Sequence, residues 1–166
     1  MRGSATLRSM IAREAFNHLV AEADFDAVLS LFDENSGAVR RLLTRLTYEP
    51  DSLLQKHAIQ AFFLLSKERA GDNYEFFREI IRSHIWGMND ESGNIDWSAP
   101  EIMGAIIAGR LDLFGEFVTI MYHTAAPEPI FHDSLLAALE LIATVDPEAA
   151  APYREDFLRH DTRAIV

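Results

Sequence analysis

Apolar residues recur along the chain in neighbouring pairs every three or four positions, which is the spacing of one face of an α-helix. The clearest stretch lies at residues 76–85, FFREIIRSHI. It predicts a helix that begins near Asp72, where Asp72 and Glu75 resemble a capping box. Similar stripes predict further helices, at residues 53–65, 102–107, 113–121 and 135–142, after Asp146, and with weaker patterns at 6–20, 25–33 and 37–47. No stretch alternates as a half-buried strand does, so we expect an all-α domain of about nine helices.

Helices joined by short connections form either a bundle or a solenoid, and a repeat within the sequence favours the solenoid. Asp-Ser-Leu-Leu occurs at residues 51–54 and again at 133–136, an offset of 82 residues. This offset equals two periods of about 41 residues, which lies within the range of HEAT and armadillo helix pairs. The pattern therefore predicts antiparallel helix pairs of the HEAT type.

Three stretches in the second half carry a further likeness: WGMNDESGNIDWSAPEIMGAI, HDSLLAALELIATVDPE and LRHDTRAIV. They resemble the bacterial HEAT-like repeat proteins, the group often labelled PBS-lyase HEAT-like. The resemblance implies that residues 1–166 form one α-solenoid domain that holds a partner, and it implies no catalytic residue. The chain lacks the basic surface of the HEAT-like DNA glycosylases, and no feature points to bilin attachment. Val166 stands where a further helix is expected, which leaves two explanations: the repeat array is truncated there, or it has an open C-terminal face that a homodimer would use.

Charge and composition narrow the class of partner. The chain of 166 residues carries a formal net charge of −11, which disfavours binding to nucleic acid or to anionic lipid. The basic group Arg40, Arg41 and Arg45 is most simply a solvated helix face.

The absence of cysteine excludes disulfides and thiol chemistry. No stretch approaches the roughly 18 apolar residues that cross a membrane, and we expect a cytoplasmic protein.

The segment Trp86 to Glu101, WGMNDESGNIDWSAPE, first suggests a calcium loop. Oxygen ligands stand at alternate positions, as in an EF-hand: Asp90, Ser92, Asn94, Asp96, Ser98 and finally Glu101. Against calcium, Ile95 occupies the position that needs glycine, and Pro100 restricts the approach of Glu101. Ser98 and Glu101 also form a capping-box pattern, which gives that carboxylate a competing structural role.

The same segment is explained better as a helix connection or as a partner site. As a connection, it would place Trp86 in the core and Trp97 in a hydrophobic staple against Ile102. As a partner site, it joins acidic side chains to an aromatic ring, a combination typical of binding hot spots. The predicted partner-binding residues are Asp90, Glu91, Asn94, Asp96 and Trp97.

The histidines offer a second candidate site. His57 and His84 lie within apolar stripes and are predicted to be buried and hydrogen-bonded. His123 and His132 flank the turn at residues 127–129, close in sequence to Tyr122 and Asp133, and could form a zinc or acid–base site if they converge.

The sequence contains no catalytic nucleophile motif and no nucleotide-binding motif. We therefore expect a non-enzymatic scaffold without a cofactor, which recognises a basic protein partner through a helical face and the acidic loop at residues 87–97. The alternative is a protein that binds calcium, zinc or a small molecule at the same loop or at the 122–133 turn.

Overall fold

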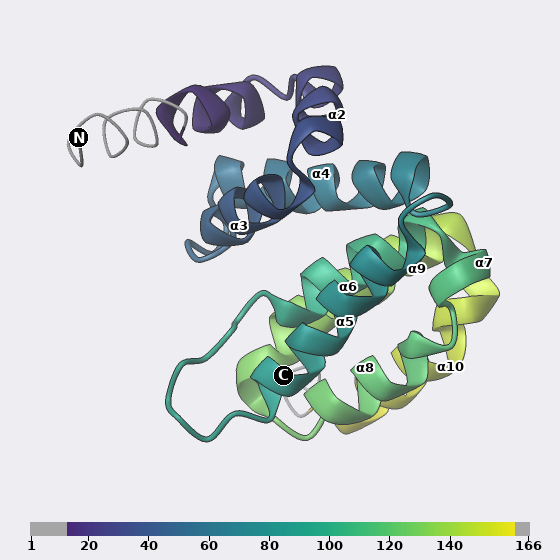
Figure 1. The fold of residues 1–166 in the computed structure, drawn as a ribbon. Helices are drawn as coiled ribbons and strands as arrows, with labels where there is room; N and C mark the ends of the chain where they lie inside the picture. Colours follow the sequence, from purple (N-terminus) through teal and green to yellow (C-terminus); the bar gives the residue numbers. More distant parts are fainter. Residues whose placement is uncertain (1–12, 162–166) are drawn as a thin grey trace. The chain divides into compact units, whose positions relative to one another are not determined.

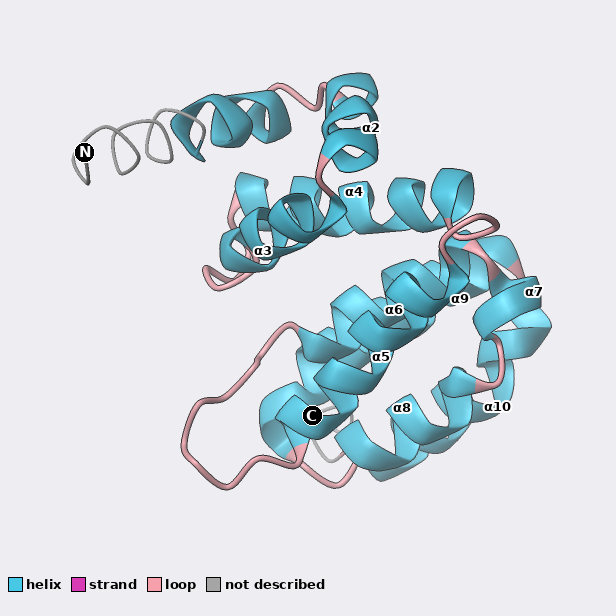
Figure 2. Ribbon diagram, viewed as in Figure 1, coloured by secondary structure: helices cyan, strands magenta, loops and turns pink. Residues whose placement is uncertain are grey.

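The computed structural model describes residues 13–161, and every regular element in this range is helical (Figures 1 and 2). Residues 13–21 are helical, and the following elements are α2 (Phe25–Glu34), α3 (Ser36–Leu46), α4 (Leu53–Arg69), α5 (Tyr74–Met88), α6 (Ala99–Gly109), α7 (Leu111–Phe114), α8 (Phe117–Ala125), the 3₁₀ helix η1 (Pro129–Phe131), α9 (His132–Val145) and α10 (Pro147–His160). The all-α prediction is confirmed. The predicted start of the first helix and the segment after Asp161 lie outside the described residues. No helix between residues 13 and 161 is long and apolar enough to cross a membrane.

The chain divides into two compact units, with the boundary inside α4 between Leu65 and Ser66. The prediction of one domain over residues 1–166 stays a prediction. In the first unit α2 packs against α3, and the side chains of Asp24 and Asn35 accept hydrogen bonds at the starts of these two helices. From residue 13 to the end of this unit, the buried apolar residues are Phe16, Val20, Val28, Phe32, Val39, Leu43, Ala58, Ile59, Ala61, Phe62 and Leu65.

Helix α6 is the centre of the second unit and contacts α5, α7, α8 and α9. Nine of its eleven residues are buried, as expected for a helix that is apolar on all sides. It approaches α9 closely at Gly104, where an added Cβ would lie 2.5 Å from the Cβ of Ala138. Helix α10 in turn packs on α9. This arrangement leaves the connection between α5 and α6 at the surface (Figure 2).

The starts of α5 and α6 differ from the predicted capping boxes. Ser98 is the residue before α6, as predicted, but its side chain makes no capping hydrogen bond. Instead the backbone N–H of Glu101 donates to Ser134 Oγ of α9 at 3.0 Å. Helix α5 begins at Tyr74, and its cap position is Asn73 rather than Asp72. In both cases the local pattern identified the helix start to within about two residues but not the groups that bond there.

The two Asp-Ser-Leu-Leu stretches occupy different positions in their helices. In the first, Ser52 precedes α4 and its Oγ accepts from the backbone N–H of Gln55 at 3.0 Å. In the second, Ser134 already lies inside the first turn of α9, which begins at His132. The identical residues therefore play different local roles, and this repeat adds no support for a solenoid.

Candidate functional site

Both tryptophans are exposed, Trp86 in the last turn of α5 and Trp97 in the loop between α5 and α6. Trp86 is 75% exposed and Trp97 is 50% exposed. The prediction that Trp86 belongs to the core is wrong. The buried positions of α5 are Phe77, Ile80, Ile81, His84 and Met88, which follow helical spacing. Trp86 stands two positions after His84, on the far side of the helix from this stripe.

A hydrogen bond between His84 and Asp96 holds the end of the loop against α5. The two atoms, His84 Nδ1 and Asp96 Oδ2, lie 2.5 Å apart. The His84 side chain is 7% exposed and that of Asp96 is 20% exposed. Asp96 Oδ1 is also buried and has no hydrogen-bond partner. Asp96, which the sequence placed in a partner site, therefore points inward and anchors the loop.

The prediction of buried, hydrogen-bonded histidines is confirmed for His84. His57 is only half-buried, and its Nδ1 lies 2.8 Å from the carbonyl oxygen of Val20. Both rings thus have structural partners.

The first part of the loop turns back on itself and presents its acidic side chains to solvent. The backbone N–H of Ser92 donates to Asp90 Oδ1 at 2.9 Å, and this bond lowers the pKa of Asp90. Gly93 follows with a φ of 85°, a conformation that favours glycine. Asp90 and Glu91 are exposed, so both carboxylates are available to a partner.

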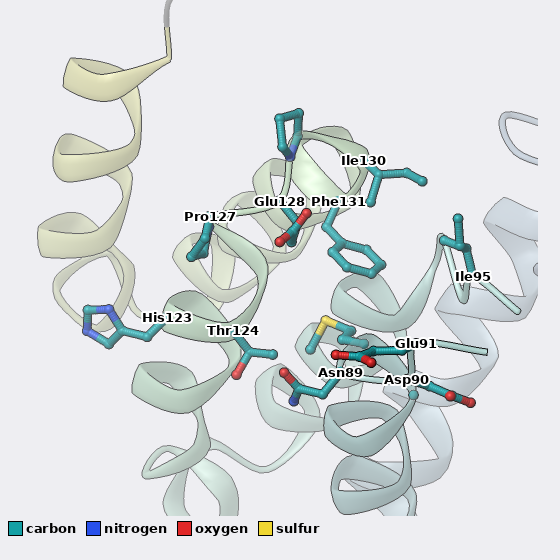
Figure 3. A pocket seen from close by; sticks show the side chains of 13 residues that line it. Asn89, Asp90, Glu91, Ile95, His123, Thr124, Pro127, Glu128, Ile130 and Phe131 are labelled. Atoms are coloured by element: carbon teal, nitrogen blue, oxygen red, sulfur yellow. The ribbon is translucent and has the colours of Figure 1, made fainter. Parts of the chain in front are cut away.

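The acidic groove, as we name it, is a surface depression of about 710 Å³ between two segments far apart in sequence (Figure 3). One wall is formed by the end of α5 and the loop after it (residues 87–91 and Ile95), and the other by the end of α8 and the turn with η1 that follows it (residues 123–124 and 127–131). Phe131 is buried and points from the second wall toward Glu91 of the first. The loop and the turn, which the sequence offered as separate candidates, therefore meet at one site.

The groove has a negative rim and apolar patches. Its carboxylates are those of Asp90, Glu91 and Glu128, and no lysine or arginine is among the described residues that line it. Apolar surface comes from Met88, Ile95, Ile130 and Phe131. Such a surface attracts a cationic group that stands beside an apolar side chain.

His123 and His132, the two histidines that flank the turn, have different surroundings. His123 is exposed and lines the acidic groove. His132 does not line it: its Nε2 lies 2.8 Å from the Ala126 carbonyl oxygen, and its ring packs edge-on against Phe157. From residue 13 to residue 161 no three His, Asp or Glu side chains are grouped so that they could hold a metal ion.

Tyr122 and Asp156 form a hydrogen-bonded pair behind the turn, with the tyrosine hydroxyl donating to the carboxylate. Burial, and then this carboxylate, raise the pKa of Tyr122. The hydroxyl in turn lowers the pKa of Asp156. The pair ties α8 to α10 and fixes one end of the groove's second wall.

The predicted partner-binding residues thus separate into three groups. Asp90 and Glu91 line the acidic groove, whereas Asn94 and Trp97 are exposed in the loop but lie outside it. Asp96 is the anchor. Sequence reasoning missed Glu128 and Phe131, although the prolines at 127 and 129 marked a turn there.

No protein-family model, curated protein or solved structure matches this chain. The fold and the site define an all-α protein with an acidic, partly apolar surface groove.

Proposed function

We propose that the chain is a non-enzymatic protein-binding module whose acidic groove receives a basic segment of a partner protein. The observation that carries the proposal is the meeting of the 87–97 loop with the 123–131 turn around one open groove. Grooves with a few placed polar groups and an apolar lining are the usual form of binding sites.

Charge selects the partner. Three carboxylates stand on the rim, and the whole chain carries a formal net charge of −11. At physiological salt a charge acts over about 8 Å, so the rim governs the final contact while the net charge favours cationic partners at longer range. Arginine is the best-suited contact because its planar group can bond a carboxylate through two N–H groups.

Apolar contact inside the groove adds to the binding energy. Ile95 is 44% exposed, and Ile130 beside the buried Phe131 is half-buried. Binding energy concentrates where one side chain of the partner is desolvated inside such a pocket. We therefore propose a recognised segment with one apolar residue flanked by arginine or lysine.

The bond between His84 and Asp96 prepares the site. A free loop of this length would lose conformational entropy on binding, and a loop that is already held in place loses less. Asp96 thus supports recognition through the position of Asp90 and Glu91 rather than through contact with the partner.

The HEAT-like assignment belongs to the same proposal. Helix α5 packs on α6, and helix α9 packs on α10, as the two helices of a repeat do. A cytoplasmic location and a preference against nucleic acid and membranes are also proposed, on the support of the acidic charge and the absence of cysteine.

Fluorescence anisotropy tests this function with a labelled peptide that carries arginines around one central leucine. A matched peptide replaces the arginines with glutamates. We expect saturable binding of the arginine peptide alone. The double variant Asp90→Lys/Glu91→Lys should weaken it by about tenfold or more, equivalent to about 1.4 kcal/mol.

The control variant is Glu155→Lys, which changes an exposed acidic residue of α10 that does not line the groove. It should bind like the unaltered chain. Equal binding of both peptides, or equal weakening by the groove variant and this control, would refute the proposal.

A further inference from the structure

A second groove, of about 590 Å³, runs between α5 and α8 and differs in character from the acidic groove. Its α5 wall carries Arg78, Arg82 and Trp86 at successive turns of the helix, and its α8 wall carries Phe117 and Ile120. Ile85 and Asn89 complete the lining. Asn89 also lines the acidic groove, so the two surfaces adjoin.

The α5–α8 groove exposes large apolar side chains without a covering element. Trp86 is 75% exposed and Ile120 is 45% exposed. Tryptophan and arginine are the residues most enriched at the centres of protein interfaces. Contiguous exposed apolar surface of this kind, bordered by charge, marks an interaction site.

Opposite charges stand on the two sides of Trp86 along the chain. Arg82 lies one helical turn before it on α5, about 6 Å along the axis, whereas Asp90 and Glu91 lie after it, in the loop just beyond the end of α5 at Met88. A surface with opposite charges on the two sides of its centre complements a copy of itself that is turned by 180°.

The end of α5 also favours a cation from outside. Its last turn contains no basic residue, and the acidic Asp90 and Glu91 follow its C-cap residue Asn89. Negative charge at the C-terminal end of a helix is unfavourable, and a nearby cation stabilises it. Arg78 pairs with Glu75 at 3.3 Å, whereas Arg82 is exposed and has no ion-pair partner between residues 13 and 161. Of the two arginines that line this groove, Arg82 is therefore the more available to another molecule.

We propose that a second copy of this chain docks on the α5–α8 groove, with the two α5 helices antiparallel and Trp86 near the two-fold axis. Arg82 of each copy meets Asp90 and Glu91 of the other, and each Trp86 packs on Phe117 and Ile120 of the other copy. The inference rests on the proposed function in one respect: Arg82 of a second copy takes the place of the partner's arginine beside the acidic loop, although the second copy as a whole carries the same formal charge of −11.

Sedimentation velocity of the full chain tests the docking over concentrations from about 10 μM to 1 mM, the range of weak association. We expect a shift from one chain to two as concentration rises. Arg82→Glu, Glu91→Lys and Trp86→Ala should each weaken association by about tenfold or more, because each removes a contact that occurs twice in a symmetric dimer. Arg41→Glu on α3 makes the same charge change outside the groove and should leave association unchanged.

Mixing two defective variants gives the decisive result. Arg82→Glu and Glu91→Lys each place like charges together at both contacts of their own dimers. In the mixed dimer one contact is the original Arg–Glu pair and the other is the reversed Glu–Lys pair, so an equimolar mixture should recover association. Three results would each overturn the docking. The chain could stay monomeric at every concentration, the variants could associate as strongly as the unaltered chain, or the mixture could fail to associate. If the chain is monomeric but binds the arginine peptide, the docking is overturned and the proposed function stands. If the chain dimerises but binds no such peptide, the proposed function is overturned and the docking stands.

Discussion

Replacing Asp96 with alanine tests the anchor of the loop. The carboxylate bonds His84, a ring with only 7% of its side chain exposed, at 2.5 Å. In the alanine variant His84 Nδ1 loses this partner while its ring stays buried. The loop at residues 89–98 also loses its attachment to α5.

The expected cost follows from opposing contributions. A hydrogen bond to a charged group contributes about 1.5–3 kcal/mol, and an unsatisfied buried donor costs about 1–3 kcal/mol. Against this, alanine removes the buried Asp96 Oδ1, which has no partner, and so removes a desolvation cost. We therefore expect Asp96→Ala to lower the free energy of unfolding by about 1–2 kcal/mol, a fall in Tm of roughly 2–8 °C.

Urea unfolding followed by far-ultraviolet circular dichroism measures this loss. Asp90→Ala is the matched control, since Asp90 is exposed in the same loop and its hydrogen bonds go to the backbone and side chain of the neighbouring Ser92. It should cost less than about 0.5 kcal/mol. A double-mutant cycle with His84→Ala should give a coupling energy of at least about 0.5 kcal/mol. Equal losses for the two aspartates, or additive effects of Asp96→Ala and His84→Ala, would refute the anchor.

Two further substitutions test the packing of the second unit. Gly104→Ala should lower the free energy of unfolding by about 1–3 kcal/mol in thermal or urea unfolding, because its Cβ would lie 2.5 Å from that of Ala138. The control Gly37→Ala, where the nearest atom is 3.6 Å away, should leave the free energy of unfolding unchanged or raise it. A change of the same sign in both variants would contradict the account. Tyr122→Phe removes the bond that lowers the pKa of Asp156 below 3.8. The stability from that bond is present above the unfolded pKa and is lost as pH falls through the lower folded value. The Tm gap between the unaltered chain and Tyr122→Phe should thus be widest near neutral pH and close in acid, and a gap that is constant with pH would show that the carboxylate is not involved.

The helices could be predicted because their signal is local. An apolar stripe such as residues 76–85 must be buried whatever it packs against, so the helical period alone identified α5 and most other elements. The mistake at Trp86 arose from reading it as a continuation of the apolar side formed by Phe77, Ile81 and Ile85. Its position lies outside the buried stripe of the same helix.

The site depends on contacts that no local pattern contains. Ser134 Oγ accepts from the amide of Glu101 across 33 residues, and a local capping box was predicted in its place. The loop and the turn were both noted as unusual, but only the packing of α6 among its neighbours brings Asp90 and Phe131 to one groove. Asp96 was grouped with the exposed acids because its bond to His84 depends on how the loop folds back on α5.

The most direct test of the central claim maps peptide binding onto the chain by nuclear magnetic resonance. The ¹⁵N-labelled chain is titrated with the arginine–leucine peptide, and the shifts of its backbone amides are followed. The account predicts saturable shifts concentrated at residues 87–95 and 123–131, and their loss in Asp90→Lys/Glu91→Lys. The absence of shifts, or shifts that centre on helix α10, would contradict a partner site at the acidic groove.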